Sequence, residues 1–367
     1  MMRGRLLGFA FAFGMMSGCL TPGGDRPALD QAVGRASGPG IEVMVDAGLG
    51  VVRAAESGAL TIWASAPEIT VRLRFAAGAA DAWTVTLDNC LPDAVITVTT
   101  KAGAIVAASS SPGEVPTAQR LQITRGGESD LVVHLHPKDA DDLSPFRFAL
   151  LSDIQEAIDR VQDIYARINQ DPSIRFVLSA GDLTQHGTHE HFVRYQREMR
   201  QLNVPCYATL GNHDIETADG IYQKYFGRGS YRFKYRGVQF TLLDSASASI
   251  DPAVYQELKG WLAEGRDQVH VVATHIPPLD PVGERNLSFA SRNEAGALLE
   301  KLAEAKVDLT LYGHIHAYYT FENAGIPAFV SGGGGAHPET MDGLGRHYMT
   351  VDLGAGGVIE TSVVRID

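Results

Sequence analysis

Five short polar clusters in the second half of this 367-residue sequence carry side chains that can bind metal ions or move protons, and each cluster follows a run of apolar residues. In chain order the clusters contain Asp153; Asp182; Asn212, His213 and Asp214; His275; and His314 with His316. Carboxylate, amide and imidazole groups without a thiolate suit Mn, Fe or Zn in a catalytic site, whereas structural zinc sites are usually built from cysteines. The residue types therefore predict a transition-metal centre.

The apolar runs before these clusters are predicted β-strands. Runs at 148–151, 176–180 and 206–210 alternate with segments whose apolar residues recur at helical spacing, which predicts parallel strands joined by helices. Later strands are predicted at 238–243, 269–273 and 307–311. Ligand sites of α/β proteins lie beyond the carboxyl ends of such strands. Isolated Asp and His residues often cap helices, but capping alone does not predict polar clusters at one strand end after another.

With these motifs in place, the sequence resembles the calcineurin-like metallophosphoesterase superfamily from about residue 146 to residue 367. That family carries, in this order, the motifs D-x-H, G-D, G-N-H-[DE], H and G-H-x-H. The corresponding pieces are Asp153-Ile154-Gln155, Gly181-Asp182, Gly211-Asn212-His213-Asp214, His275 and Gly313-His314-Ile315-His316. The first motif departs from the family, because Gln155 stands where a ligating histidine is usual.

The resemblance implies an α/β fold, a β-sandwich flanked by helices, with two divalent transition-metal ions (Mn, Fe or Zn) at its edge. Asp182 would bridge both ions, and Asp153 and His316 would hold the first one together with Gln155. The second ion would be held by Asn212, His275 and His314. A hydroxide that bridges the ions would then hydrolyse a phosphate mono- or diester.

The same resemblance assigns two residues to catalysis. His213 matches a histidine that binds no metal and stabilises the developing charge or protonates the leaving oxygen. Asp214 would orient the ring of His213. His186, on the loop after Asp182, is a candidate substrate contact, although a solvated loop histidine explains it equally well.

Gln155 leaves two functional hypotheses open. An amide oxygen binds transition metals more weakly than an imidazole does, so the first site is expected to be looser, although some branches of the superfamily carry glutamine here. The main hypothesis is a hydrolase that acts on ester bonds of a small-molecule or macromolecular phosphoester. The alternative is an inactive metallophosphoesterase-like lipoprotein that only holds a ligand.

The first 39 residues predict export rather than a fold. Residues 1–18 combine two arginines, a short apolar run and small residues, as a secretory signal peptide does. Cys19 follows as in bacterial lipoproteins, which predicts a lipid anchor and a place in the cell envelope, on the periplasmic or surface side of a bacterial membrane. A plain signal peptide with an incidental Cys19 is the alternative. Residues 19–39, rich in Gly, Pro and Ala, are predicted to be a linker.

Residues 40–137 predict a smaller all-β sandwich that precedes the phosphoesterase-like part. Segments at 60–63, 69–75, 83–87, 94–98 and 131–136 alternate apolar with polar residues, and six to eight antiparallel strands are expected. No motif assigns this domain a role; it could itself bind a polysaccharide or a protein partner and deliver the enzyme.

The charge and the cysteine content argue against a broad nucleic-acid surface and against a disulfide bond. The net charge is −12 and no long basic run occurs, so a broad nucleic-acid surface is not expected. Beyond Cys19 the sequence contains only Cys90 and Cys206, which fall in different predicted domains. Both are expected to be buried thiols rather than a disulfide.

Overall fold

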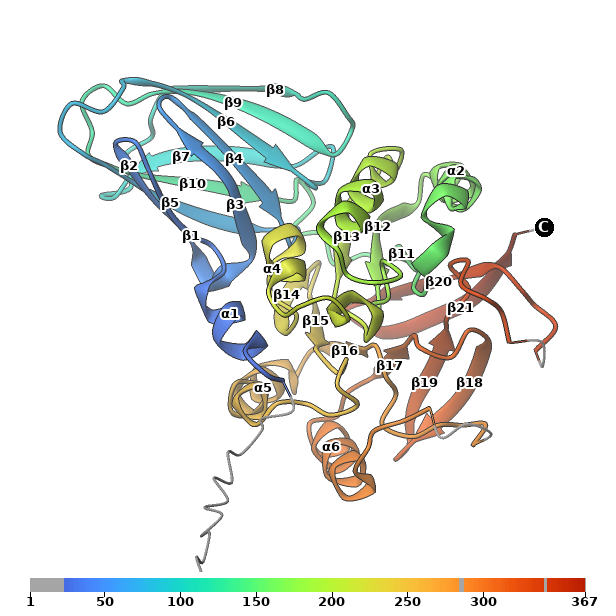
Figure 1. Cartoon of the computed structure of the whole chain (residues 1–367). Coiled ribbons are helices and arrows are strands. Elements are labelled where there is room, and N and C mark those ends of the chain that lie inside the picture. The colour runs from blue at the N-terminus through green and yellow to red at the C-terminus, as the bar shows by residue number, and fades with distance from the viewer. Residues whose placement is uncertain (1–22, 284–286, 340–341, 367) are drawn as a thin grey trace, which may run out of the picture.

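The computed structural model describes residues 23–283, 287–339 and 342–366. They form an all-β front domain and a mixed α/β domain that begins at residue 146 (Figure 1). The predicted signal peptide and Cys19 lie outside the described residues. No helix in the described ranges has the length and apolar character needed to cross a membrane.

The α/β domain contains two sheets. The first has the order β13-β12-β11-β20-β21 and the second the order β14-β15-β16-β17-β19-β18. The first consists of β11 (Phe146–Leu150), β12 (Ile174–Ser179), β13 (Cys206–Ala208), β20 (His347–Gly354) and β21 (Gly357–Arg365). The second consists of β14 (Tyr231–Tyr235), β15 (Val238–Leu243), β16 (Val269–Thr274), β17 (Leu309–Tyr312), β18 (Tyr318–Asn323) and β19 (Ile326–Ser331). In the first sheet β13, β12 and β11 pair in parallel, as predicted, and β20 and β21 are added antiparallel. In the second sheet β15, β16, β17 and β19 pair in parallel, and the edge strands β14 and β18 are antiparallel.

A shared aromatic core joins the two sheets face to face. Phe148 and Phe176 of the first sheet stack at 5.5 Å, and the ring of Phe176 meets Phe240 of the second sheet edge to face at 5.5 Å. All three side chains are fully buried. Because each such ring removes a large apolar surface from water, this layer fixes the two sheets against each other. The β-sandwich fold expected for this domain is confirmed.

Helices cover both outer faces of the sandwich. On the first sheet lie α2 (Gln162–Asn169), α3 (His189–Met199) and α4 (Ile221–Phe226), and on the second lie α5 (Pro252–Gly265) and α6 (Arg292–Glu304). Side chains cap the longer helices: Thr188 accepts a hydrogen bond from the backbone of His191, and Ser291 accepts one from Glu294. Helices alternate with strands as the apolar spacing predicted.

The front domain packs two five-stranded sheets, so it has ten strands instead of the expected six to eight. One sheet contains β1 (Arg35–Gly38), β2 (Ile41–Val45), β5 (Ile69–Phe75), β7 (Val95–Thr100) and β10 (Asp130–His136). The other contains β3 (Gly50–Glu56), β4 (Ala59–Ala64), β6 (Ala82–Asp88), β8 (Ala108–Pro112) and β9 (Ala118–Thr124). Four of the five predicted segments lie within strands, and the fifth, 94–98, overlaps β7 except for its first residue. Strands β4 and β6 pair in parallel, which the alternation could not reveal.

Residues 23–39 do not form the predicted linker. They fold as α1 (Arg26–Ala32) and β1, and α1 packs on the α/β domain. Arg26 is only 4% exposed, and its guanidinium donates to Asp244 at 2.6 Å, to Asp219 at 3.0 Å and to Ser247 at 2.8 Å. Since a buried charge requires such partners, these bonds hold the segment in place, and composition alone did not show them.

One asparagine joins the front domain to the edge of the first sheet. The side chain of Asn89 donates to the carbonyl of Cys206 at 2.8 Å and accepts from its backbone N–H at 2.9 Å. It thereby satisfies both backbone groups of a residue on the edge strand β13. Cys90 and Cys206 are free and buried, as predicted.

Candidate metal centre

The predicted ligands lie beyond the carboxyl ends of strands, in loops except for Gln155, which begins the 3-10 helix Gln155–Arg160. Asp153 and Asp182 follow β11 and β12, and Asn212 lies beyond β13 in the same sheet. The three histidines, His275, His314 and His316, follow β16 and β17 of the second sheet. The site therefore lies at one edge of the sandwich, where strand ends from both sheets meet.

Two groups of converging ligand atoms form there, with all atoms of a group within 4.8 Å of one another. One group contains Asp182, His275 and His314, and the other contains Asp153, Asp182 and His316. Asp182 belongs to both. This is the division into two sites that the sequence motifs imply, and its donor atoms are those that Mn, Fe and Zn accept.

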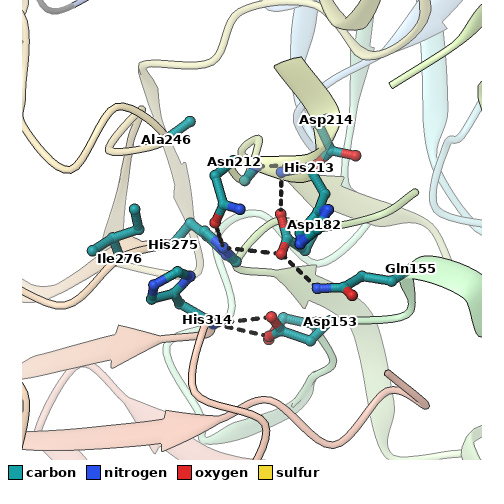
Figure 2. Close-up of polar contacts among 12 residues, drawn as sticks. Asp153, Gln155, Asp182, Asn212, His213, Asp214, Ala246, His275, Ile276 and His314 are labelled. Atoms are coloured by element: carbon teal, nitrogen blue, oxygen red, sulfur yellow. Dashed lines mark hydrogen bonds and ion pairs between the residues drawn. The ribbon is translucent and has the colours of Figure 1, made fainter. Parts of the chain in front are cut away.

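The first contacts around Asp182 are short and buried. Its Oδ2 lies 3.3 Å from Nε2 of His275, which in turn lies 3.1 Å from Oδ1 of Asn212. In the other group, Nε2 of His316 lies 3.6 Å from Oδ1 of Asp153. Figure 2 shows Asp153, Asn212 and His275 arranged around Asp182.

Backbone groups fix which imidazole nitrogen faces the site. Nδ1 of His275 lies 2.8 Å from the carbonyl oxygen of Ala180, and Nδ1 of His316 lies 2.8 Å from that of His337. A carbonyl can only accept, so Nδ1 carries the proton in both rings and Nε2 is directed to the ligand group. This is the arrangement that metal-binding histidines require.

The loops are also braced against each other through backbone donors. The N–H of His213 donates to Oδ1 of Asp182 at 2.9 Å, and the N–H of His314 donates to Oδ1 of Asp153 at 3.0 Å. Ser152 donates from its hydroxyl to Oδ2 of Asp153 at 2.6 Å. Each carboxylate is therefore oriented by a neighbouring motif, and the two sheets are tied together at the site.

Burial and mutual charge shift the pKa values of the ligands. Burial alone would lower the pKa of His275, but the charge of Asp182 raises it to about 9. Burial would raise the pKa of Asp182, but the charge of His275 lowers it to about 2. For His314, burial and the neighbouring His275 lower the pKa to about 3, which keeps its lone pair free. The buried carboxylate therefore attracts positive charge, which divalent ions would supply.

Four of the predicted ligands have left-handed backbone conformations, which are unfavourable for residues other than glycine. The φ angles are 60° at Asp153, 48° at Gln155, 51° at Asp182 and 70° at His314. Such angles cost of the order of 1 kcal/mol or more each and tend to cluster at functional sites. Here the strained positions lie in three of the ligand-bearing loops: the loop of Asp153 and Gln155, the loop of Asp182, and the loop of His314.

Gln155 reaches the first group. Its amide nitrogen donates to Oδ2 of Asp182 at 2.8 Å and lies 3.1 Å from Nε2 of His316. A half-turn about the last side-chain bond would bring the amide oxygen to the same place. The side chain of Gln155 is thus long enough to bind a metal ion in the first group. Its amide oxygen is a weaker metal ligand than an imidazole, and this distinguishes the first group from the second.

His213 lies beside the ligands, but Asp214 does not hold its ring, contrary to expectation. Nδ1 of His213 lies 2.8 Å from Oε1 of Glu216 and 3.0 Å from the carbonyl oxygen of Gln185. The buried carboxylate of Asp214 instead accepts four hydrogen bonds of 3.0–3.1 Å, from backbone or hydroxyl groups of Leu183, Thr184 and Gly211. Leu183 and Thr184 lie on the loop of Asp182 and Gly211 lies on the loop of Asn212, so the carboxylate of Asp214 holds these two loops together.

Part of the chain matches the model of a known protein family. Residues 146–318 match the family model of calcineurin-like phosphoesterases. These residues form a calcineurin-like phosphoesterase domain. The geometry agrees with that assignment, since the candidate ligands of the domain form two metal-binding groups around one carboxylate.

Curated relatives of the phosphoesterase domain include cyclic-nucleotide phosphodiesterases. A 3′,5′-cyclic adenosine monophosphate phosphodiesterase of Pseudomonas aeruginosa is 24% identical over 242 residues, 59% of this chain and 82% of the relative. A 3′,5′-cyclic-nucleotide phosphodiesterase of Nostoc is 29% identical over 167 residues, 40% of this chain and 57% of the relative. These two similarities are distant.

A solved structure resembles both domains in fold. Purple acid phosphatase from yellow lupin seeds aligns with a TM-score of 0.51 and 14% identity, over 82% of this chain and 72% of its own. Because the match covers 82% of this chain, it extends from the phosphoesterase domain into the front domain. An all-β domain before the phosphoesterase domain is thus an arrangement found in another protein of this fold.

Two kinds of site residue escaped the sequence analysis. The carbonyls of Ala180 and His337 act through the backbone, so no residue type signals them. Glu216 was missed because a glutamate after a G-N-H-D motif has no distinctive spacing. The candidate substrate residue His186 is more than half exposed and pairs with Glu216 at 2.7 Å.

Proposed function

We propose that this protein is a metal-dependent phosphoesterase that hydrolyses phosphate diesters, with 3′,5′-cyclic nucleotides as the first candidate substrates. The observation that carries the proposal is the position of Asp182 in both groups of ligand atoms. A single shared carboxylate is how two ions are held close enough to act on one phosphoryl group. The diester class is supported by the relatives, whose activity is on cyclic nucleotides.

The residues divide into binding and proton-transfer roles. When bound, two divalent ions supply Lewis-acid charge to the phosphoryl oxygens and activate water. Asp182 would bridge the ions, Asp153, His316 and Gln155 would hold the first, and the remaining ligands the second. His213 would donate the proton on Nε2 to the leaving oxygen, so that the P–O bond breaks without release of a free alkoxide. The imidazole then keeps its Nδ1 proton and is neutral.

A panel of esters tests this proposal. Protein purified without chelators is assayed with Mn²⁺, Fe²⁺ or Zn²⁺ on bis(p-nitrophenyl) phosphate, p-nitrophenyl phosphate and 3′,5′-cyclic adenosine monophosphate. Metal-dependent turnover of a diester is expected, and the Asp182→Asn variant should lose it. If metal is bound at two ions per chain but no ester is hydrolysed, the proposal fails and the inactive ligand-binding lipoprotein becomes the better hypothesis.

We also propose that the mature chain starts at Cys19, with a lipid anchor, on the outer side of a bacterial membrane. The backbone of Gly23 already bonds to Asp251 at 3.2 Å. Four residues after Cys19 span at most about 14 Å, so the phosphoesterase domain would lie close to the bilayer. Membrane fractionation of the full chain and of Cys19→Ala tests this. Equal amounts of both proteins in the membrane fraction would contradict it.

A further inference from the structure

The contacts of the His213 ring fix its tautomer: Nδ1 forms a hydrogen bond with the Gln185 carbonyl and an ion-pair contact with the Glu216 carboxylate. Both groups that contact Nδ1, the Glu216 carboxylate and the Gln185 carbonyl, can only accept a hydrogen bond. Nδ1 must therefore carry a proton. Within the described ranges Nε2 has no hydrogen-bond partner, which leaves that nitrogen available to a substrate.

The position of Glu216 follows from local backbone structure. His213 starts the 3-10 helix His213–Ile215, and Glu216 is the residue that follows it. Residues three apart lie on the same side of a 3-10 turn, so the carboxylate of Glu216 lies next to the ring of His213. Its second oxygen, Oε2, lies 2.7 Å from Nδ1 of His186, whose ring stacks on His191 at 5.7 Å. The carboxylate is thus held by two imidazoles.

The group formed by Glu216, His213 and His186 is separate from the metal ligands. Among the described residues, the metal-binding groups are the two that share Asp182, and Glu216 belongs to neither. Nor does Asp214 replace it, because the carboxylate of Asp214 accepts from the loop backbone. The exposed fraction of the Glu216 side chain is 40%, so it contributes orientation rather than a large electrostatic energy.

We propose that Glu216 is a positioning residue for His213. It holds one proton on Nδ1 and directs Nε2, which bears the proton to be donated when the ring is an imidazolium, toward the leaving oxygen of the substrate, while His186 fixes the carboxylate from its other side. The catalytic role of Glu216 rests on the proposed phosphoesterase function. The effect of Glu216 on the His213 ring can be tested without measuring activity.

The activity test uses leaving groups of different basicity. Glu216→Ala is compared with Glu300→Ala, a matched change of an exposed glutamate on α6. With an alkyl diester such as 3′,5′-cyclic adenosine monophosphate, kcat should fall about 10-fold because protonation of the leaving oxygen is required. With bis(p-nitrophenyl) phosphate, whose leaving group departs unprotonated, the loss should be about twofold at most. An equal loss on both esters indicates a merely structural role and overturns the proposal.

A conservative variant separates orientation from charge. In Glu216→Gln the amide oxygen can still accept from Nδ1 of His213. This variant should recover most of the kcat lost in Glu216→Ala, with KM unchanged in both. A Gln variant as slow as the Ala variant would contradict a positioning role.

Selective ¹⁵N labelling of histidine provides the readout that does not depend on turnover. In metal-free protein, the His213 signals, assigned by comparison with His213→Asn, should show the Nδ1–H tautomer. In Glu216→Ala only the Gln185 carbonyl still accepts from Nδ1, so the population of the Nδ1–H tautomer should fall, whereas Glu300→Ala should leave the signals unchanged. If the wild type hydrolyses no ester, the proposed function fails and this measurement still decides on Glu216. An unchanged tautomer in Glu216→Ala would overturn the proposal.

Discussion

Nε2 of His275 lies 3.3 Å from Oδ2 of Asp182, and the two side chains are almost completely inaccessible to solvent. The same oxygen accepts a hydrogen bond from the amide of Gln155 at 2.8 Å. One carboxylate oxygen thus lies between a residue of each ligand group. Any change at Asp182 should therefore affect both groups at once.

Asp182→Asn is expected to abolish metal binding at both sites. The amide keeps the shape of the side chain but removes the charge that two ions would share. Metal measured by elemental analysis should fall from about two ions per chain to less than one, and diesterase activity should fall at least 100-fold, since even residues outside the ligand set typically alter affinity 10- to 100-fold. Asp153→Asn is the control, because it belongs to one group only and should leave one ion bound. Equal losses in the two variants would contradict the shared role of Asp182.

Gln155→His is expected to strengthen the first site. An imidazole binds transition metals more tightly than an amide oxygen, and Gln155 already reaches His316 and Asp182 in the fold. Metal retained after dialysis should rise toward two ions per chain, with activity equal to or above that of the wild type at low metal concentration. Equal occupancy in both proteins would show that Gln155 does not limit metal binding.

The ligand set could be predicted because it depends on strand ends, which the sequence reveals. Apolar runs such as 269–273 are recognisable as strands, and parallel strands bring their carboxyl ends to one edge whatever the loops between them do. The resemblance to a family then divided the ligands into two groups. His275 and Asp182, 93 positions apart, could be paired for that reason although nothing local connects them.

The interactions that hold the ligands were much harder to predict. Arg26 and Asp244 form a buried pair across 218 positions, and a short Pro-containing helix of seven residues gave no clear periodicity. The wrong linker prediction for residues 23–39 follows from that. Likewise, Glu216 rather than Asp214 contacts the ring of His213 because the chain forms a 3-10 turn there, and the sequence motif did not reveal that turn.

Gly211→Ala is expected to damage the site through a steric clash. A Cβ at this position would collide with Oδ1 and the backbone nitrogen of Asp182. Either the loop that carries Asn212 or the bridging carboxylate must then move, at a cost of about 1–3 kcal/mol in the free energy of unfolding. Urea unfolding and metal content should both show the defect. Gly260→Ala on α5, where a Cβ would meet open space, is the control and should be neutral or slightly stabilising.

Asp30 is expected to make stability depend on pH. It lies on α1, and its carboxylate accepts hydrogen bonds from the backbone of Gly229 and Ser230 and from Gln223, at 3.0–3.1 Å. Burial, only partly offset by these bonds, raises its pKa from 3.8 to about 6. The folded state therefore binds a proton more tightly than the unfolded state does. The stabilisation from that proton is complete below pH 3.8 and is lost as the pH rises through 6.

The Asp30→Asn variant isolates this contribution. The variant should be less stable than the wild type at low pH, because an amide can replace only part of the carboxylate's acceptor positions. The difference in unfolding free energy between the two proteins should shrink by about 2 kcal/mol between pH 4.5 and 7.5, as the wild type alone loses its proton. Urea unfolding at four pH values in this range measures the difference. Asp163→Asn, at a partly exposed carboxyl whose pKa is lowered by Arg346, is the control and should not reproduce this trend. A constant difference between wild type and Asp30→Asn would show that Asp30 keeps an ordinary pKa in the folded protein.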